Sequence, residues 1–241
     1  MWSKINILRR LYRVSFFKTL LLNFYKLPLK QAVKLPIIVS RNTYYYDLSG
    51  SIIFQGDVKF GMIRFGFMGE DTNVWKNNRV LINVSGKLIF TGSVRFGVGV
   101  SLRVEKQGIL QMGNNILINY NSKLICYDKI TIGDDCNIAW DVQILDTDLH
   151  FIENIETNFI PSRTSPVEIG KHIWIGNRVS IQKGTKIPDY CIIASGSLVN
   201  TKSECSENDI IAGIPAKVVR HNYRYLFCED ENSIINSFNY K

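Results

Sequence analysis

A six-residue repeat in the last third of the chain constrains the fold more than any other feature. An aliphatic residue recurs at every sixth position and is often followed by glycine or alanine: Ile169, Ile175, Ile181, Ile187, Ile193 and Val199. An earlier run keeps the same step: Ile132, Ile138 and Ile144. A helical period of 3.6 residues or a strand period of 2 does not explain a period of six. A fixed repeat of this kind indicates a solenoid.

Each hexad fits one short strand followed by one corner. The aliphatic residue points inward, and the small residue after it lets the backbone turn without side-chain crowding. Three hexads make a triangular coil of 18 residues, and successive coils stack as parallel strands about 4.8 Å apart. The fifth hexad position should also face inward, and its residues are mostly small or β-branched: Cys136, Val142, Ile173, Val179, Thr185, Cys191 and Ser197. The sequence therefore predicts an all-β solenoid with one continuous aliphatic core.

The N-terminal half repeats more faintly. Residues 48–61 return at 84–97 with eight of 14 positions identical, at an offset of 36 residues. We interpret this offset as two coils, and the alternative is a pair of β-hairpins with glycine turns. The expected solenoid covers residues 42–217 in roughly eight or nine coils. Insertions near 67–80 and at 146–166 interrupt it.

Composition narrows the class of protein. The chain has 241 residues, of which 46% are hydrophobic, and this allows one elongated domain with a sizeable core. Its five cysteines are an odd number and contain no CxxC pair. They are therefore expected to be reduced, in a cytoplasmic protein that has no metal site.

Residues 1–41 form a basic arm. They hold nine basic residues and no acidic one. Because the whole chain has a net charge of +8, residues 42–241 have a net charge of −1. An apolar stripe at helical spacing runs through the arm: Ile5, Leu8, Tyr12, Phe16, Leu20, Phe24 and Leu27. Residues 1–36 would either lie on an anionic membrane surface or cap the solenoid, and both can hold together. Nucleic-acid binding is not expected, because the body offers no basic groove. Residues 221–241 are expected to form a short C-terminal tail.

Two segments carry a family resemblance. Residues 169–176 (IGKHIWIG) with the later hexads, and residues 212–220 (AGIPAKVVR), resemble the hexapeptide-repeat acyltransferases, which have a left-handed parallel β-helix. Within this superfamily the chain is similar to the maltose and galactoside O-acetyltransferases, which are related to capsule and lipopolysaccharide O-acetyltransferases. The match is strong over 118–220, weaker over 42–117 and absent from the arm, so the β-helix acyltransferase domain is expected at 42–220.

The resemblance implies an activity and an assembly. The activity is acetyl transfer from acetyl-CoA to a hydroxyl of a sugar or surface-glycan intermediate. The alternative is N-acylation of an amino sugar on the same fold with the same base. The assembly is a homotrimer with active sites between subunits, located in the cytoplasm or on the inner face of the membrane.

Acetyl transfer to a hydroxyl requires a general base, and an imidazole is suited to this near neutral pH. His150 lies in the segment 146–150, where the hexad pattern breaks, and the resemblance places the catalytic histidine there. Asp148 would orient His150, although a backbone carbonyl would serve equally well. Alternatively, Asp146 and Asp148 would bind hydroxyl groups of the acceptor sugar. His172 and His221 are expected to pack or to face solvent.

The resemblance also implies binding residues. Asn119 would contact the acceptor sugar, and the alternative is an asparagine ladder at the solenoid corners. The residues expected to bind acetyl-CoA are Trp174, Asn177, Ser195, Asn200, Thr201, Lys217 and Arg220. Trp174 would wall the pantetheine channel, and Lys217 or Arg220 would meet the nucleotide phosphates. The family's Thr-Lys pair is shifted by one residue here, at 200–202, and this leaves the contacts at the adenine end open.

Overall fold

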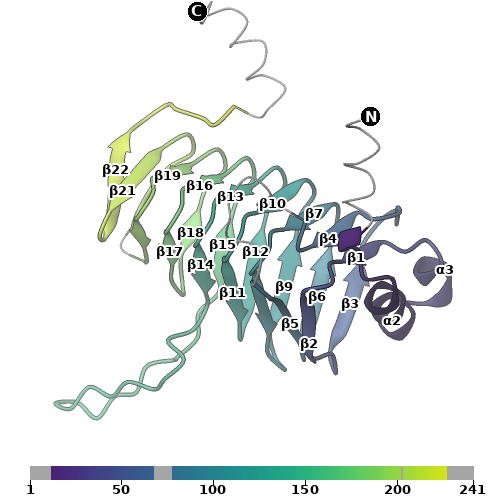
Figure 1. Ribbon diagram of the computed structural model, residues 1–241. Helices are drawn as coiled ribbons and strands as arrows, with labels where there is room; N and C mark the ends of the chain where they lie inside the picture. The colour runs from purple at the N-terminus through teal and green to yellow at the C-terminus, as the bar shows by residue number, and fades with distance from the viewer. Residues whose placement is uncertain (1–11, 68–77, 202, 227–241) are drawn as a thin grey trace, which may run out of the picture.

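The computed structural model describes residues 12–67, 78–201 and 203–226 as a triangular prism of stacked β-strands (Figure 1). The strands form three faces, which we name by their strand number. The nine-stranded face contains β1 (Ile37–Val39), β4 (Ile63–Phe65), β7 (Val94–Phe96), β10 (Ile116–Ile118), β13 (Asn137–Ile138), β16 (Trp174–Ile175), β19 (Ile192–Ile193), β21 (Ile210–Gly213) and β22 (Ala216–Arg220). The seven-stranded face contains β2 (Thr43–Asp47), β5 (Val80–Val84), β8 (Ser101–Val104), β11 (Lys123–Cys126), β14 (Gln143–Leu145), β17 (Ser180–Ile181) and β20 (Leu198–Val199). The six-stranded face contains β3 (Ser51–Phe54), β6 (Lys87–Phe90), β9 (Ile109–Met112), β12 (Lys129–Ile132), β15 (Val167–Ile169) and β18 (Lys186–Ile187).

The chain visits the three faces in rotation, which confirms the predicted left-handed β-helix. Each coil takes one strand from each face. Because the smallest face has six strands, the described residues form six complete coils. This is fewer than the eight or nine expected. Neighbouring coils pair in parallel, and β22 alone among the described strands turns back antiparallel, on β21 at the C-terminal end of the stack.

The offset of 36 residues spans one coil and not two. Ile52 of β3 pairs directly with Leu88 of β6, so the two similar segments lie on adjacent coils. The extra length comes from the segment between β4 and β5, most of which (68–77) lies outside the described residues. Coil length also varies, because Leu88 pairs with Leu110 and Glu168 with Lys186. The interpretation as two coils was therefore wrong, since it assumed coils of 18 residues throughout.

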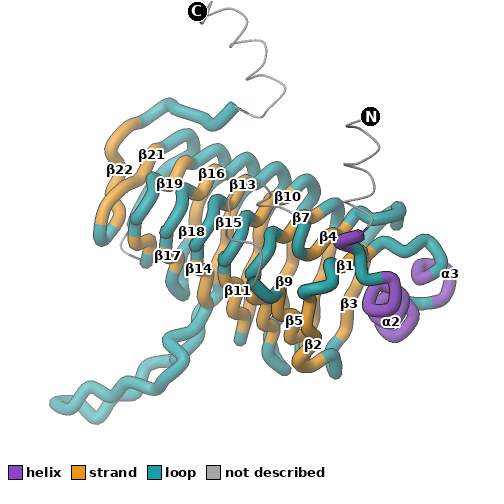
Figure 2. The backbone as a smooth tube through the Cα atoms, viewed as in Figure 1, coloured by secondary structure: helices purple, strands orange, loops and turns teal. Residues whose placement is uncertain are grey.

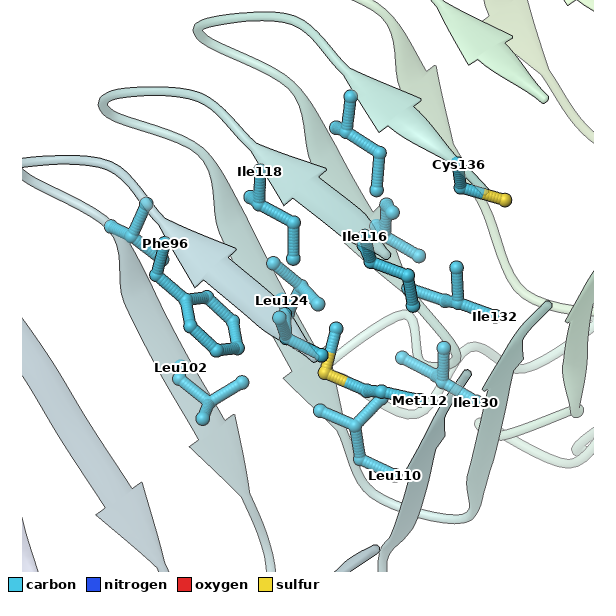
Figure 3. Close-up of a cluster of buried hydrophobic side chains, with 14 of the residues drawn as sticks. Phe96, Leu102, Leu110, Met112, Ile116, Ile118, Leu124, Ile130, Ile132 and Cys136 are labelled. Carbon is cyan, nitrogen blue, oxygen red and sulfur yellow. The ribbon is translucent and has the colours of Figure 1, made fainter. Parts of the chain in front are cut away.

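The core is a continuous stack of side chains from all three faces (Figure 3). Every fifth-position residue predicted to face inward is buried: Cys136, Val142, Ile173, Val179, Thr185, Cys191 and Ser197. Aromatic residues fill the longer N-terminal coils, where the rings of Phe65 and Phe96 stack with centroids 4.2 Å apart. Burial raises the pKa of the Cys136 thiol to about 12, so this cysteine stays protonated and packs as a small apolar residue.

Helix α2 (Phe16–Lys26) covers the N-terminal end of the prism, and α3 (Leu29–Ala32) follows it (Figure 1). The first coil begins with β1, inside the stretch that the sequence assigned to the arm. The outer edge of β1 bonds to two buried side chains of α2. Asn23 donates to the carbonyl of Ile37 (2.7 Å) and accepts from its N–H (3.1 Å). Thr19 accepts from the N–H of Val39 at 3.2 Å. The arm therefore caps the solenoid, because an unpaired strand edge would otherwise remain at its end.

The opposite surface of α2 is apolar and exposed. Large side chains there are 45–76% exposed: Phe16, Phe17, Leu20, Leu21, Phe24 and Tyr25. Phe16, Leu20 and Phe24 of the expected apolar stripe thus lie on α2 and face away from the solenoid, whereas Leu27 is buried. Thr19, Leu22 and Asn23 face inward, and Ile5 and Leu8 lie outside the described residues. Capping the strand requires hydrogen-bonding groups, which leaves the apolar side of the helix outside.

Candidate active site

The loop 146–166 leaves the prism at the corner between the seven-stranded and six-stranded faces, after β14 and before β15. Figures 1 and 2 show it projecting away from the coils. Bridges between Thr147 and Thr164 and between Asn154 and Phe159 hold its two arms together. The break in the repeat is therefore a defined projection from an otherwise regular surface.

His150 is exposed on the outgoing arm of this loop. Its imidazole has no hydrogen-bond partner within the described residues. The carboxylate of Asp148 forms an ion pair with Lys183, with Nζ and Oδ2 2.5 Å apart, and it does not bond to His150. The N–H of Asp148 donates to the carbonyl of Arg163 at 2.9 Å. In this single chain Asp148 thus fixes the loop on the neighbouring coil.

Asp146 is fully buried at the root of the loop. Its two carboxylate oxygens accept from the N–H groups of Tyr127 and Asp128, each at 2.8 Å. Desolvation is the larger influence on this carboxyl, and it raises the pKa of Asp146 despite these hydrogen bonds. A buried carboxylate that spends both oxygens on the preceding coil is not available to the hydroxyl groups of a sugar. The geometry therefore favours a structural role over the acceptor-binding role expected from the sequence.

Asn119 follows β10 at the corner between the nine-stranded and seven-stranded faces. Its N–H donates to the carbonyl of Ile138 (2.8 Å), and beside it the rings of Tyr120 and Trp140 stack at 5.7 Å. The alternative of an asparagine ladder applies to a different corner. There, side-chain oxygens accept from backbone N–H groups of the preceding coil, Asn114 from Ser93 at 2.9 Å and Asp134 from Asn114 at 2.7 Å. Asn119 does not belong to that ladder.

Three of the expected acetyl-CoA residues lie together. Trp174 is 40% exposed on β16 of the nine-stranded face. Asn177 follows at the next corner, where the Ser195 hydroxyl of the adjacent coil donates to its Oδ1 at 2.6 Å. The ring of Tyr225 lies 5.3 Å from that of Trp174, and its hydroxyl accepts from Asn137 at 3.1 Å. The start of the tail thus packs against the Trp174 surface.

The other four expected acetyl-CoA residues lie elsewhere. Asn200 and Thr201 follow β20 at the same corner as the loop 146–166. Lys217 and Arg220 are exposed on β22 at the end of the prism, and the Arg220 guanidinium bonds to the hydroxyl of Tyr223 at 3.3 Å. The seven residues therefore do not form one surface within a single chain.

His150 and Trp174 lie on opposite sides of the prism. A triangular prism has three corners, and each corner lies opposite one face. The loop leaves at the corner between the seven-stranded and six-stranded faces, which is opposite the nine-stranded face that bears Trp174. One chain alone therefore does not bring the candidate base to the candidate acetyl-CoA wall.

The other two histidines have structural partners. The ring of His172 stacks on that of Tyr190, with centroids 4.8 Å apart, at the corner between the six-stranded and nine-stranded faces. His221 Nδ1 lies 2.7 Å from the buried carboxylate of Asp209. The three histidines thus lie at separate places in the fold, so they cannot converge on one metal ion.

Sequence reasoning missed Lys183 and Arg163, which surround the loop root. The register between adjacent coils places Lys183 beside the loop root. Gln143 pairs with Ser180 across adjacent coils, and the same offset brings Lys183 level with Asp146. That offset depends on the length of the inserted loop, so the regular hexad count does not reveal it.

Comparison with known proteins agrees with the fold. No protein-family model matches the chain. A protein of Escherichia coli (strain K12) named for O-acetyl transfer in lipopolysaccharide biosynthesis, WbbJ, is 32% identical over 101 residues, which cover 39% of this chain and 50% of that protein. The galactoside O-acetyltransferase of the same organism is 33% identical over 91 residues, which cover 38% of this chain and 43% of that protein. Over about two fifths of its length the chain is therefore similar to these O-acetyltransferases.

A solved structure has the same fold over most of the chain. The crystal structure of the polySia specific acetyltransferase NeuO superposes with a TM-score of 0.60 and 19% identity, over 84% of this chain and 86% of that one. At this identity the likeness shows the fold alone. The chain spans about half the length, or less, of the two curated relatives.

Proposed function

We propose that this chain is an acetyl-CoA-dependent O-acetyltransferase that acts on a hydroxyl of a sugar or surface-glycan intermediate. The main support is the exposed imidazole of His150 on the loop that interrupts the coil. The named activities of WbbJ and the galactoside enzyme point to the same reaction. Acetyl-CoA supplies the acetyl group, and the protein supplies the base and the binding surfaces.

His150 is the general base in this proposal. A sugar hydroxyl is a poor nucleophile near neutral pH, and a neutral imidazole within hydrogen-bond reach removes its proton as the new bond forms. Asp148 acts on His150 through the loop, because its ion pair with Lys183 holds the outgoing arm against the neighbouring coil. Asn119 would position the acceptor from its corner.

A neighbouring subunit completes the proposed site. Trp174 with Asn177 and Ser195 would form the wall for the pantetheine arm, but this wall lies opposite the loop of its own chain. In a homotrimer of parallel prisms, the loop of one subunit reaches the nine-stranded face of the next. Lys217 and Arg220 would then meet the nucleotide phosphates of acetyl-CoA, and Asn200 and Thr201 would line the channel from the loop side.

The test compares His150→Ala with the matched control His172→Ala. Acetyl transfer is measured with radiolabelled acetyl-CoA and a panel of neutral, anionic and amino sugars. Loss of a general base is expected to lower kcat at least about 100-fold for His150→Ala, while His172→Ala retains wild-type turnover. Turnover by His150→Ala that equals the wild type would refute the mechanism. Preferential labelling of amino sugars would favour N-acylation instead.

We further propose that the apolar surface of α2 lies on an anionic membrane. No helix in the described part of the chain is long and apolar enough to cross a bilayer. The six exposed apolar side chains of α2 form a face suited to the interface of a bilayer. The arm contains only basic charge, and the exposed Lys30 and Lys34 follow α2 directly. An anionic surface complements both features, and it would hold the enzyme beside a lipid-linked acceptor.

Point variants test this proposal better than deletion of residues 1–36, because deletion would uncover the edge of β1. The double variant Phe17→Ser with Tyr25→Ser should float with vesicles containing phosphatidylglycerol at least about tenfold less than the wild type. The control Ile155→Ser removes an apolar residue that is 89% exposed on the distant loop and should float normally. Equal flotation of all three proteins would contradict membrane contact through α2.

A further inference from the structure

Arg163 is held between two aromatic rings beside the candidate base. Its guanidinium carbon lies 5.3 Å from the ring centre of Tyr127 and 5.0 Å from that of Phe151. Phe151 directly follows His150 in the loop, so the Arg163 guanidinium contacts the residue next to the candidate base. Arg163 forms no ion pair with a carboxylate of the described residues, so this part of the chain does not neutralise its charge.

The backbone of Tyr127, whose ring supports Arg163, is anchored to the core. The N–H of Tyr127 donates to the buried carboxylate of Asp146 at 2.8 Å. On the prism side, the guanidinium carbon of Arg103 lies 5.4 Å from the centre of the same ring. Arg103 also pairs with Glu105, which orients its side chain. Two arginines thus lie against one tyrosine at the root of the loop 146–166.

This arrangement leaves the hydrogen-bonding edge of Arg163 available. A guanidinium that lies over an aromatic ring keeps its N–H groups in the plane of the fork, where they match the two oxygens of a carboxylate or phosphate. A solvated surface arginine pays side-chain entropy to bind an anion, whereas contacts with two rings have already restricted Arg163. Of the three neighbouring cations, Lys183 pairs with Asp148 and Arg103 with Glu105, so Arg163 is left to bind an anion.

We propose that Arg163, supported by Tyr127 and Arg103, is the anion-binding subsite of the acceptor site, so that the sugar presented to His150 bears a carboxylate or phosphate group. This inference rests on the proposed acetyl transfer and specifies its substrate class. The anion would bind beside Phe151 and place a neighbouring hydroxyl at the imidazole. Arg163 is then a specificity-determining residue and not a member of the proton-transfer machinery.

Binding measurements test the subsite independently of activity. The probes are a galacturonate tetramer and its methyl ester, which differ in the charge of their carboxyl groups, and glucose 1-phosphate with glucose as the phosphate pair. Titration calorimetry with the full-length protein should show that the wild type prefers the anionic member of at least one pair by roughly tenfold or more. The pair that shows the preference identifies the anion as carboxylate or phosphate.

Variants assign the preference to Arg163. Arg163→Gln should reduce the anionic-to-neutral ratio to near one, and Arg163→Lys should retain only part of it, because an ammonium group lacks the planar fork. The control Lys87→Gln removes an equal charge from the six-stranded face and should behave as the wild type. Thermal unfolding of each variant confirms that it is folded.

The outcomes separate this inference from the proposed function. A wild-type protein without charge preference, or Arg163→Gln that keeps the full preference, would overturn the inference even where acetyl transfer to neutral sugars is found. Weakened acetyl-CoA binding by Arg163→Gln with unchanged acceptor preference would also overturn it, by assigning the cation to the phosphates of CoA. Conversely, an Arg163-dependent preference in a protein that never transfers acetyl groups would support the anion site and refute the proposed activity.

Discussion

Replacing Asp146 with alanine distinguishes a structural role at the loop root from a role in binding the acceptor. The carboxylate is fully buried and accepts from Tyr127 and Asp128 at 2.8 Å each. Alanine would leave both N–H groups in a partly buried corner without their acceptor. The substitution should therefore destabilise the corner that supports Tyr127 and anchors the loop of His150.

The size of the effect follows from these two hydrogen bonds. A hydrogen bond to a charged group contributes about 1.5–3 kcal/mol net. The sum for two bonds is reduced by the desolvation of the carboxylate, which also raises its pKa. We therefore expect a loss of about 2–4 kcal/mol in the free energy of unfolding. For a domain of this size, each kcal/mol lowers Tm by roughly 2–4 °C, so the expected decrease is about 4–16 °C.

The assay combines thermal unfolding with steady-state kinetics well below both Tm values. If Asp146 has a structural role, the alanine variant should have a lower Tm and an acceptor KM within about threefold of the wild type. If Asp146 binds the acceptor, the variant should keep the wild-type Tm and have an acceptor KM raised about tenfold or more. A Tm within 1 °C of the wild type (about a quarter of the smallest expected shift) would refute the reasoning from burial and hydrogen bonding.

The pH dependence provides a second check on Asp146. Because its pKa is raised in the folded state, the folded protein binds more protons than the unfolded chain at pH values just above the ordinary carboxyl pKa. Its contribution to stability is therefore greatest below that ordinary value and is lost as pH rises through the raised pKa. Asp146→Asn removes this titration, so the wild type should lose stability relative to the variant as pH rises through that window.

Three further predictions concern other parts of the fold. Asn23→Ala removes both side-chain bonds to the edge of β1 and should lower the free energy of unfolding by about 2–4 kcal/mol in urea titrations; an unchanged midpoint would contradict the capping role. Trp174→Ala should raise the KM for acetyl-CoA about tenfold or more with the acceptor KM unchanged, if this surface walls the pantetheine channel; an unchanged KM would remove Trp174 from the site. Burial pushes the pKa of Asp209 upward, but the N–H of Ser206 and the imidazole of His221 outweigh it and lower that pKa. The stabilisation from Asp209 is thus complete above its ordinary value and is lost as pH falls through the lowered one, so Asp209→Asn should show a smaller loss of stability in acid than the wild type.

The hexad pattern predicted the coil architecture because its information is local. Each aliphatic residue, Ile175 for example, lies inside because its own six-residue unit folds into one strand and one corner. The buried fifth positions, such as Cys136 and Ser197, follow from the same local geometry. Where the coils lengthen, as between Leu88 and Leu110, counting by six no longer gives the register, and the coil number was overestimated.

The candidate site was predictable in part. The break in the repeat located the loop and His150 without any tertiary information. The partners of the loop residues were not predictable, because they come from neighbouring coils. Asp148 meets Lys183 only because the inserted loop shifts the register between β14 and β17.

The sequence by itself determined the stacked-coil fold, its aliphatic core and the place where a loop departs from it, since all three are properties of a short repeating unit. Tertiary structure decided what the polar residues do. Burial assigned Asp146 to backbone N–H groups, because a carboxylate removed from water requires partners at close range. The exposed strand edge turned Thr19 and Asn23 inward and left the apolar side of α2 outside, because satisfying buried backbone groups outweighs the burial of that apolar face.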